Sequence, residues 1–255
     1  MQDAANLLEQ TILIARRAGE VIVQIYETDF SVRGKEDASP VTDADEQAET
    51  LIVRDLAQLT PELPIVSEEA SSARGLPNVG SRFWLVDPLD GTKEFVSRNG
   101  EFTVNVALIE DGTATLGVVF APALGRLFAG ALGLGAFVEE HGKRRRIACR
   151  PQPAEGLTVV SSRSHGNAKM PPEILNGRRV ASSVRAGSSL KFCMIACGSV
   201  DLYPRLGRTM EWDTAAGHAV LAAAGGRVME LNGPELAYGK PGFENPHFIA
   251  MGLPT

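Results

Sequence analysis

The stretch Phe83–Thr92, with the sequence FWLVDPLDGT, decides the architecture of this chain. Its first four residues are apolar and rich in aromatic side chains, which indicates a short buried strand over 83–87. Two acids at the end of such a strand are costly to bury unless a cation or another partner neutralises them. Pro88 keeps the acid before it extended, and with Gly91 it favours a tight turn that directs both carboxylates and the Leu89 carbonyl toward one point. Oxygen ligands of this kind suit hard cations, above all Mg²⁺.

Three further acids bear on this interpretation. Glu68 follows a short apolar segment, and Asp213 precedes the run 215–224, whose small residues predict a helix that packs closely on a neighbour. An isolated acid pair would be explained as a turn facing water, and Asp213 alone as a helix N-cap. The two additional acids at strand-end and helix-start positions favour a shared cation site. Asp45 lies in the first turn of a helix expected over 43–59, where interaction with the helix dipole is the better explanation from the residues alone.

The composition limits the class of protein. The chain has 255 residues and a formal net charge of −6, which argues against broad attraction to nucleic acid or to a membrane surface. It contains three cysteines, which make no paired disulfide framework and fit a reducing compartment. We recognise no signal peptide and no apolar run of transmembrane length. We therefore expect a cytoplasmic protein, with contact at the cytoplasmic face of the inner membrane left open.

The pattern of predicted elements divides the chain near 151–153 into two parts, residues 1–150 and 151–255. The first part is expected to contain helices over 4–29 and 43–59, a loop over 70–81, strands within 102–140 joined by a hairpin at 111–112, and an exposed hairpin at the basic run 143–146. The second part alternates, with strands expected at 157–161, 178–183, 200–204, 227–231 and 248–251 and helices at 167–176, 188–198 and 212–224. Alternation of this kind predicts a layered α/β sheet.

Two segments could bind anions. Gly91 and Thr92 open a predicted helix directly after the acid pair, so their N–H groups are suited to a phosphate bridged to metal ions, as in metal-assisted phosphoryl transfer. The Thr92 hydroxyl could cap this helix, contact an attacking water, or do both. Ser188 and Lys191 lie three apart at another helix start, where they could hold a second anion with Arg205. For each of these three residues taken alone, a solvated surface position is the simpler interpretation.

Three motifs in this order resemble those of a known family. They are Ser67-Glu68-Glu69, the segment 84–92, and the segment 212–217, and they are similar to those of the lithium-sensitive, magnesium-dependent phosphatases of the inositol monophosphatase superfamily. The resemblance spans nearly the whole chain. Lys93-Glu94-Phe95 is similar to the CysQ-type branch, the bacterial 3′(2′),5′-bisphosphate nucleotidases, whereas inositol monophosphatases usually carry Asn-Phe there. The segments 35–45, 162–165, 187–191 and 203–205 also resemble that branch.

The resemblance implies an α/β (α+β) fold, the layered αβαβα sugar-phosphatase fold. It implies that two or three Mg²⁺ ions are held by Glu68, Asp87, Asp90, Asp213 and the Leu89 carbonyl. It implies that water is activated by Asp45 and Thr92, and that the substrate's other phosphate is held by Ser188, Lys191 and Arg205. The full set of implied substrate contacts is Glu68, Leu89, Asp90, Gly91, Thr92, Ser188, Lys191, Arg205 and Asp213.

The expected activity is Mg²⁺-dependent hydrolysis of 3′-phosphoadenosine 5′-phosphate to AMP and phosphate, a step of sulfur metabolism. The sulfated analogue, 3′-phosphoadenylyl sulfate, is the expected second substrate. The first alternative is an inositol or other sugar monophosphatase on the same scaffold, which would have no second phosphate for Lys191 and Arg205. The second is a non-catalytic nucleotide sensor, against which the complete acid set argues. The expected partner is a small-molecule bisphosphate nucleotide and no nucleic acid, with monomer and homodimer left open.

Overall fold

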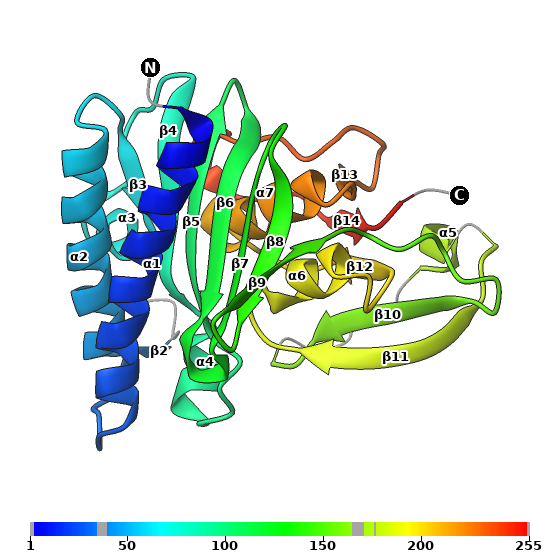
Figure 1. Ribbon diagram of the computed structural model, residues 1–255, viewed down its shortest axis with the longest axis horizontal. Coiled ribbons are helices and arrows are strands. Elements are labelled where there is room, and N and C mark those ends of the chain that lie inside the picture. Colours follow the sequence, from blue (N-terminus) through cyan, green and yellow to red (C-terminus); the bar gives the residue numbers. More distant parts are fainter. Residues whose placement is uncertain (1–2, 35–39, 165–170, 176, 254–255) are drawn as a thin grey trace.

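The computed structural model describes residues 3–34, 40–164, 171–175 and 177–253. Five layers follow one another across the molecule (Figure 1): the helix pair α1 and α2, a seven-stranded sheet, the helices α6 and α7, a five-stranded sheet, and the short helix α5. The layered αβαβα fold expected from the sequence is therefore confirmed. The seven-stranded sheet comes from residues before 150 and the five-stranded sheet from residues after it, while the expected division into two domains stays a prediction.

The outer helices form where the apolar periodicity predicts them. Helix α1 (Ala4–Tyr26) is capped by the Asp3 side chain, which accepts a hydrogen bond from the Ala5 N–H. Helix α2 (Asp43–Leu59) begins with a capping box between Thr42 and Asp45. The buried stripes of both helices pack in one apolar core with one face of the large sheet, so these helices and the capping box are fixed to that sheet.

The seven-stranded sheet is covered on both faces. Its strands lie in sequence order, with the first pair parallel and the others antiparallel. Along its second strand, Trp84 and Val86 face the core beneath α1 and α2, whereas Phe83 and Leu85 face the core beneath α6 and α7. The strands are β3 (Ile65–Ser67), β4 (Arg82–Asp90), β5 (Thr103–Glu110), β6 (Thr113–Ala121), β7 (Arg126–Ala131), β8 (Gly135–Glu140) and β9 (Lys143–Ile147).

Helices α6 (Leu190–Ala196) and α7 (Ala215–Ala223) lie between the two sheets (Figure 1). Glycine permits the close approach of α7 to the large sheet, because a Cβ on Gly117 would lie 2.4 Å from the Ala216 carbonyl oxygen. The prediction that the small residues of this helix allow close packing is thus confirmed. Close packing brings the start of α7, and Asp213 just before it, to the edge where β4 ends.

The five-stranded sheet forms the second sheet layer, in the order β11-β10-β12-β14-β13. Ile174 of helix α5 (Pro172–Leu175) packs with side chains of β10 and β12 in a separate small core. The strands are β10 (Leu157–Ser162), β11 (Val180–Ala186), β12 (Leu202–Arg205), β13 (Arg227–Glu230) and β14 (Phe248–Met251). The remaining elements are β1 (Arg33–Gly34), β2 (Pro40–Val41), α3 (Glu68–Arg74), α4 (Thr92–Val96), η1 (Pro122–Leu124), η2 (Glu211–Asp213) and η3 (Pro241–Phe243).

Three expectations about local structure were wrong. Strand β4 continues to Asp90 instead of ending at Asp87, because a register shift between the two acids absorbs an extra residue as a bulge, and a bulge tolerates a proline without an N–H. The expected loop 70–81 begins with helix α3, whose first N–H groups are capped by Glu49 from α2 at 3.1 Å. The expected helix 212–224 divides into η2 and α7. Of the helix expected over 167–176, residues 167–170 and 176 lie outside the described residues.

Candidate functional site

A cavity of about 1340 Å³ opens where the ends of β4, η2 and the start of α6 meet. It is lined by both acidic and basic side chains from distant parts of the chain. The structure brings together here all of the predicted site residues except Asp45, namely Glu68, Asp87, Leu89, Asp90, Gly91, Thr92, Ser188, Lys191, Arg205 and Asp213. The cavity therefore combines the two segments that the sequence indicated as anion-binding with the acids that it indicated as cation-binding.

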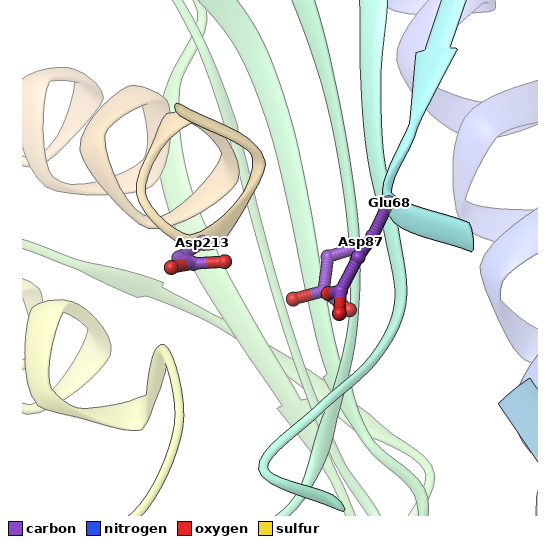
Figure 2. Close-up of side chains that lie close together, drawn as sticks. All are labelled: Glu68, Asp87 and Asp213. Atoms are coloured by element: carbon purple, nitrogen blue, oxygen red, sulfur yellow. The ribbon is translucent and has the colours of Figure 1, made fainter. Parts of the chain in front are cut away.

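Three carboxylates meet in this cavity. Each of Glu68, Asp87 and Asp213 places a carboxylate oxygen within 4.8 Å of the others. Figure 2 shows that they come from separate elements and face one shared space. Glu68 starts α3, Asp87 lies on β4 before the bulge, and Asp213 ends η2. Three oxygen donors in this arrangement form a candidate site for a hard divalent cation.

The electrostatics of the three acids fit a cation. Removal from bulk water, together with the negative charges of Asp90 and Glu68, raises the pKa of Asp213 to about 8. Keeping carboxylates charged close together and away from water costs free energy unless a positive charge lies among them. The donor set contains only oxygen atoms, which matches Mg²⁺ or Ca²⁺ better than a metal that prefers sulfur or nitrogen.

The buried carboxylate of Glu211 holds the short helix η2, and with it Asp213. Glu211 is fully buried and accepts hydrogen bonds from the Gly239 N–H at 2.7 Å and from the Lys240 N–H at 2.9 Å. The Lys240 ammonium lies 2.7 Å from the same carboxylate. Within η2, Asp213 accepts a hydrogen bond from the Met210 N–H at 2.9 Å. These bonds orient the Asp213 side chain toward the cavity.

The bulge at the end of β4 shapes the acid turn. The Asp87 carboxylate accepts a hydrogen bond from the Leu89 N–H at 3.1 Å, and the Leu89 carbonyl accepts one from the Thr92 hydroxyl at 3.3 Å. Gly91 has a φ of +91°, and a Cβ there would lie 3.3 Å from the Ser188 Cβ. A side chain at this position would therefore both strain the backbone and crowd the second half of the site.

The Asp45 carboxylate is buried next to Thr92, which lines the cavity. Its Oδ2 accepts hydrogen bonds from the N–H and the hydroxyl of Thr42, each at 2.8 Å, which completes the capping box. Its Oδ1 lies 3.4 Å from the Thr92 hydroxyl oxygen, which can donate its one proton either to Asp45 or to the Leu89 carbonyl. The capping role and the proximity to Thr92 thus coexist.

Ser188, Lys191 and Arg205 line the same cavity as the acids, with Lys191 near Asp90 and Arg205 near Asp213. Lys191 is only 5% exposed, so a solvated surface position was the wrong explanation for it. Burial lowers the pKa of Lys191 to about 8 although the nearby Asp90 favours its charged form. Its ammonium donates to the Ser188 carbonyl and lies 5.2 Å from the centre of the Tyr203 ring. A buried cation at the wall of a cavity is suited to an anionic ligand.

Ser188 and Arg205 have unpaired polar atoms beside this cation. Within the described residues, neither the buried Ser188 hydroxyl nor the Arg205 Nε has a hydrogen-bond partner. Ser188 has a φ of +46°, an uncommon conformation for a residue with a side chain. The preceding Gly187 N–H donates to Glu101 at 2.7 Å, and Arg163 pairs with the same carboxylate. The turn that presents Ser188 and Lys191 is therefore held firmly against the first half of the chain.

Comparison with known proteins identifies the scaffold. The family model described as the inositol monophosphatase family matches residues 3–250. This chain belongs to the inositol monophosphatase family. It is 47% identical over 245 residues to the 3′(2′),5′-bisphosphate nucleotidase CysQ of Escherichia coli strain K12, a match that covers 95% of this chain and 98% of that protein.

Solved structures of the inositol monophosphatase family have the same fold. The crystal structure of CysQ from Bacteroides thetaiotaomicron, a bacterial member of the family, is 34% identical, has a TM-score of 0.81 and covers 98% of each chain. The IMPase of Thermotoga maritima is 27% identical with a TM-score of 0.77, and the match covers 96% of this chain and 92% of that one. Among the described residues, no helix has the length and apolar character needed to cross a membrane.

The structure adds buried polar residues that the sequence analysis did not assign. Asn105 and Ser189 hydrogen-bond to Asp90, and Glu94 lines the cavity and accepts a hydrogen bond from the Ser164 hydroxyl. An available signal for Asn105 was a polar residue within the otherwise apolar run 104–109. Ser189 carried none that distinguishes it from its neighbour Ser188. Of the segments that resembled the CysQ-type branch, residues 35–39 and His165 lie outside the described residues.

Proposed function

We propose that this member of the inositol monophosphatase family removes the 3′-phosphate of 3′-phosphoadenosine 5′-phosphate, giving AMP and phosphate. The observation that carries the proposal is one cavity lined both by three convergent carboxylates and by the buried Lys191. The names of relatives such as the E. coli nucleotidase support the same substrate class. A sulfated analogue, 3′-phosphoadenylyl sulfate, offers the same 3′-phosphate and is our proposed second substrate.

We propose that the cation is Mg²⁺, bound by Glu68, Asp87 and Asp213. Asp90 and the Leu89 carbonyl line the same cavity and would complete the ligand set for a second or third ion. When bound, Mg²⁺ supplies a Lewis acid that lowers the pKa of water and neutralises charge on the phosphoryl oxygens. The donor chemistry supports this choice, since Mg²⁺ is commonly bound by a few carboxylates together with substrate phosphates.

In this proposal, Asp45 and Thr92 activate the attacking water. The Thr92 hydroxyl lies 3.4 Å from the Asp45 Oδ1 and is within reach of both that carboxylate and the cavity. The water donates its proton through Thr92 to Asp45 as its oxygen bonds to phosphorus. The bond between phosphorus and the 3′ oxygen breaks, and the 3′ oxygen, which keeps the electron pair, takes up a proton from solvent to give the hydroxyl of AMP. N–H groups of Gly91 and Thr92, at the start of α4, face the transferred phosphate.

We propose that Ser188, Lys191 and Arg205 bind the 5′-phosphate. A buried ammonium and an unpaired hydroxyl next to each other are both donors, so an anion with several acceptor oxygens satisfies them together. Inositol 1-phosphate has no second phosphate for this site. This difference favours the nucleotide over an inositol phosphate as the substrate.

We propose a location in the cytoplasm, which the three free cysteines support. Among the described residues we find no feature that supports contact with the inner membrane. The proposed partner is a small-molecule bisphosphate nucleotide.

The test is phosphate release from 3′-phosphoadenosine 5′-phosphate and from inositol 1-phosphate, each with and without Mg²⁺ and with added Li⁺. We expect Mg²⁺-dependent release that is faster from the nucleotide and inhibited by Li⁺. Faster release from inositol 1-phosphate would favour the sugar phosphatase alternative. No Mg²⁺-dependent release from either compound would instead point to a nucleotide-binding protein without catalysis.

A further inference from the structure

Ser189 lies between two of the predicted metal ligands, Asp90 of β4 and Asp213 of η2. Its side chain is 1% exposed, and its hydroxyl oxygen lies 2.9 Å from Asp90 Oδ2 and 2.8 Å from the Asp213 carbonyl oxygen. It also accepts a hydrogen bond from the Asn105 Nδ2 at 2.9 Å. A hydroxyl has one proton, so it donates to one of these two oxygens at a time while its lone pair binds the amide. Ser189 thus joins an acid of β4 to the backbone of η2.

Asn105 fixes the same acid from the large sheet. It lies on β5 directly opposite Asp87 in the strand register, and its Nδ2 donates to Asp90 Oδ2 at 3.3 Å as well as to Ser189. The carboxylate determines which way this amide faces, because only the NH₂ group can donate to it. Two neutral side chains, one from each half of the chain, therefore hold the Asp90 carboxylate from two directions.

We propose that Asn105 and Ser189 are positioning residues that hold Asp90 and Asp213 at a fixed separation and so set the affinity and the size selectivity of the cation site. The inference rests on the metal site of the proposed function. Neither residue is proposed to contact the cation. They act by orienting its ligands, as hydrogen-bond partners of metal ligands commonly do.

The physical reason is repulsion between acids that belong to different layers. Asp90 ends a strand of the large sheet, whereas Asp213 belongs to η2, and both charges lie beside Glu68 in one cavity. Without a link, mutual repulsion favours side-chain positions in which these carboxylates lie farther apart. Mg²⁺ demands near-ideal octahedral geometry, whereas Ca²⁺ accepts longer and more varied distances. If these ligands are held less firmly, the affinity for Mg²⁺ should therefore fall more than the affinity for Ca²⁺.

Ser188 supplies a matched control one residue away. It is also a buried serine of the same turn and lines the cavity, but its hydroxyl has no hydrogen-bond partner among the described residues. Removal of that hydroxyl should weaken nucleotide binding and leave cation affinity unchanged. Ser189→Ala and Ser188→Ala therefore remove the same atom type with opposite expected consequences.

The test is calorimetric titration of substrate-free protein with Mg²⁺ and, separately, with Ca²⁺. We expect Ser189→Ala to raise the Kd for Mg²⁺ by about 10- to 100-fold and the Kd for Ca²⁺ by a smaller factor. Ser188→Ala should keep the wild-type Kd for both ions. Ser189→Thr, which keeps the hydroxyl, should retain more Mg²⁺ affinity than Ser189→Ala. A purely structural role would lower the melting temperature and leave the Kd of the folded protein and the Mg²⁺ to Ca²⁺ ratio unchanged.

Wild-type Mg²⁺ affinity in a folded Ser189→Ala protein would overturn the inference. If Ser189→Ala does not fold, Asn105→Ala replaces it, and wild-type affinity in that variant would overturn the inference in the same way. Failure of the proposed function would be seen differently, as wild-type protein that binds Mg²⁺ but releases no phosphate from the nucleotide. A wild-type protein that binds neither ion would contradict both.

Discussion

The cavity has an acidic side and a basic side, which differ in the charge of the ligand that each can bind. On the acidic side, formed by Glu68, Asp87 and Asp213, three convergent carboxylates could hold a cation. On the basic side, formed by Ser188, Lys191 and Arg205, the ammonium of Lys191 and the hydroxyl of Ser188 are buried donors suited to an anion. A ligand with two phosphates together with metal ions satisfies both sides at once. Under the proposed function, the basic side sets substrate selectivity and the acidic side carries the catalytic chemistry.

The largest effect is expected from removing a carboxylate of the acidic side. Asp213→Asn removes one of the three converging carboxylates, and turnover of the nucleotide should fall by at least about 100-fold, the scale of losing one preorganised electrostatic group. The melting temperature of the metal-free protein should rise, because the charge of Asp213 is disfavoured by burial and by Asp90 and Glu68. Phosphate-release assays and thermal unfolding in a chelator check the two outcomes. Wild-type turnover in this variant would show that the cation lies elsewhere.

The next effect separates the two sides. Lys191→Met keeps most of the side-chain volume and removes the buried charge, so kcat/KM for the nucleotide should fall by about 10- to 100-fold, the scale of a hydrogen bond to a charged group. Any slow hydrolysis of inositol 1-phosphate should be unchanged, because that compound does not reach the basic side. Equal losses with both compounds would mean that Lys191 supports the acidic side instead.

The pH dependence of kcat/KM for the nucleotide also tests the role of Lys191 on the basic side. The pKa of Lys191 is lowered to about 8, below its ordinary value, so the free protein loses this positive charge as pH rises through about 8. We expect kcat/KM for the nucleotide to fall over that range, since kcat/KM reports the groups of the free enzyme. Lys191→Arg should abolish the fall because arginine stays charged. An alkaline fall that persists in Lys191→Arg would assign it to another group.

The same shift affects stability with a defined sign. Between about 8 and the ordinary lysine value, the unfolded chain binds a proton at residue 191 that the folded protein does not. The contribution of Lys191 to the free energy of unfolding therefore rises with pH in this interval. The difference in unfolding free energy between wild type and Lys191→Met, measured at several pH values, isolates it.

The smallest expected effect concerns the support of Asp45. Thr42→Ala removes the hydroxyl that caps α2 and that donates to the Asp45 carboxylate at 2.8 Å. Loss of an N-cap hydroxyl costs about 1 kcal/mol of stability, and we expect a modest fall in kcat without a change in cation affinity. Denaturant unfolding and steady-state kinetics check both. A cation affinity that falls with the cap would link Asp45 to the metal site.

The acidic side was the more predictable one because its information is local. The contiguous segment Phe83–Thr92 contains two acids and predicts a strand and a helix start within ten residues, and the structure has each of them. The capping box of α2 and the hairpin at Asp111 and Gly112 are predictable for the same reason, since neighbours in sequence determine them. The bulge after Asp87 was missed because it depends on pairing with β5.

The basic side could not be derived from its residues because burial decides its character. A lysine three residues after a serine is most often exposed, and only the packing of α6 between two sheets buries Lys191. The helix α3 was missed for a related reason, since its cap comes from Glu49 on another helix. Ser189 shows the same limit, because its partners Asp90, Asn105 and Asp213 are far from it in the sequence.

The most direct test of the central claim is anomalous diffraction from crystals of this protein soaked in Mn²⁺, a substitute for Mg²⁺ with a strong anomalous signal. The account predicts a peak in the space shared by the carboxylates of Glu68, Asp87 and Asp213. No peak there, or a peak only at another group of acids, would contradict it.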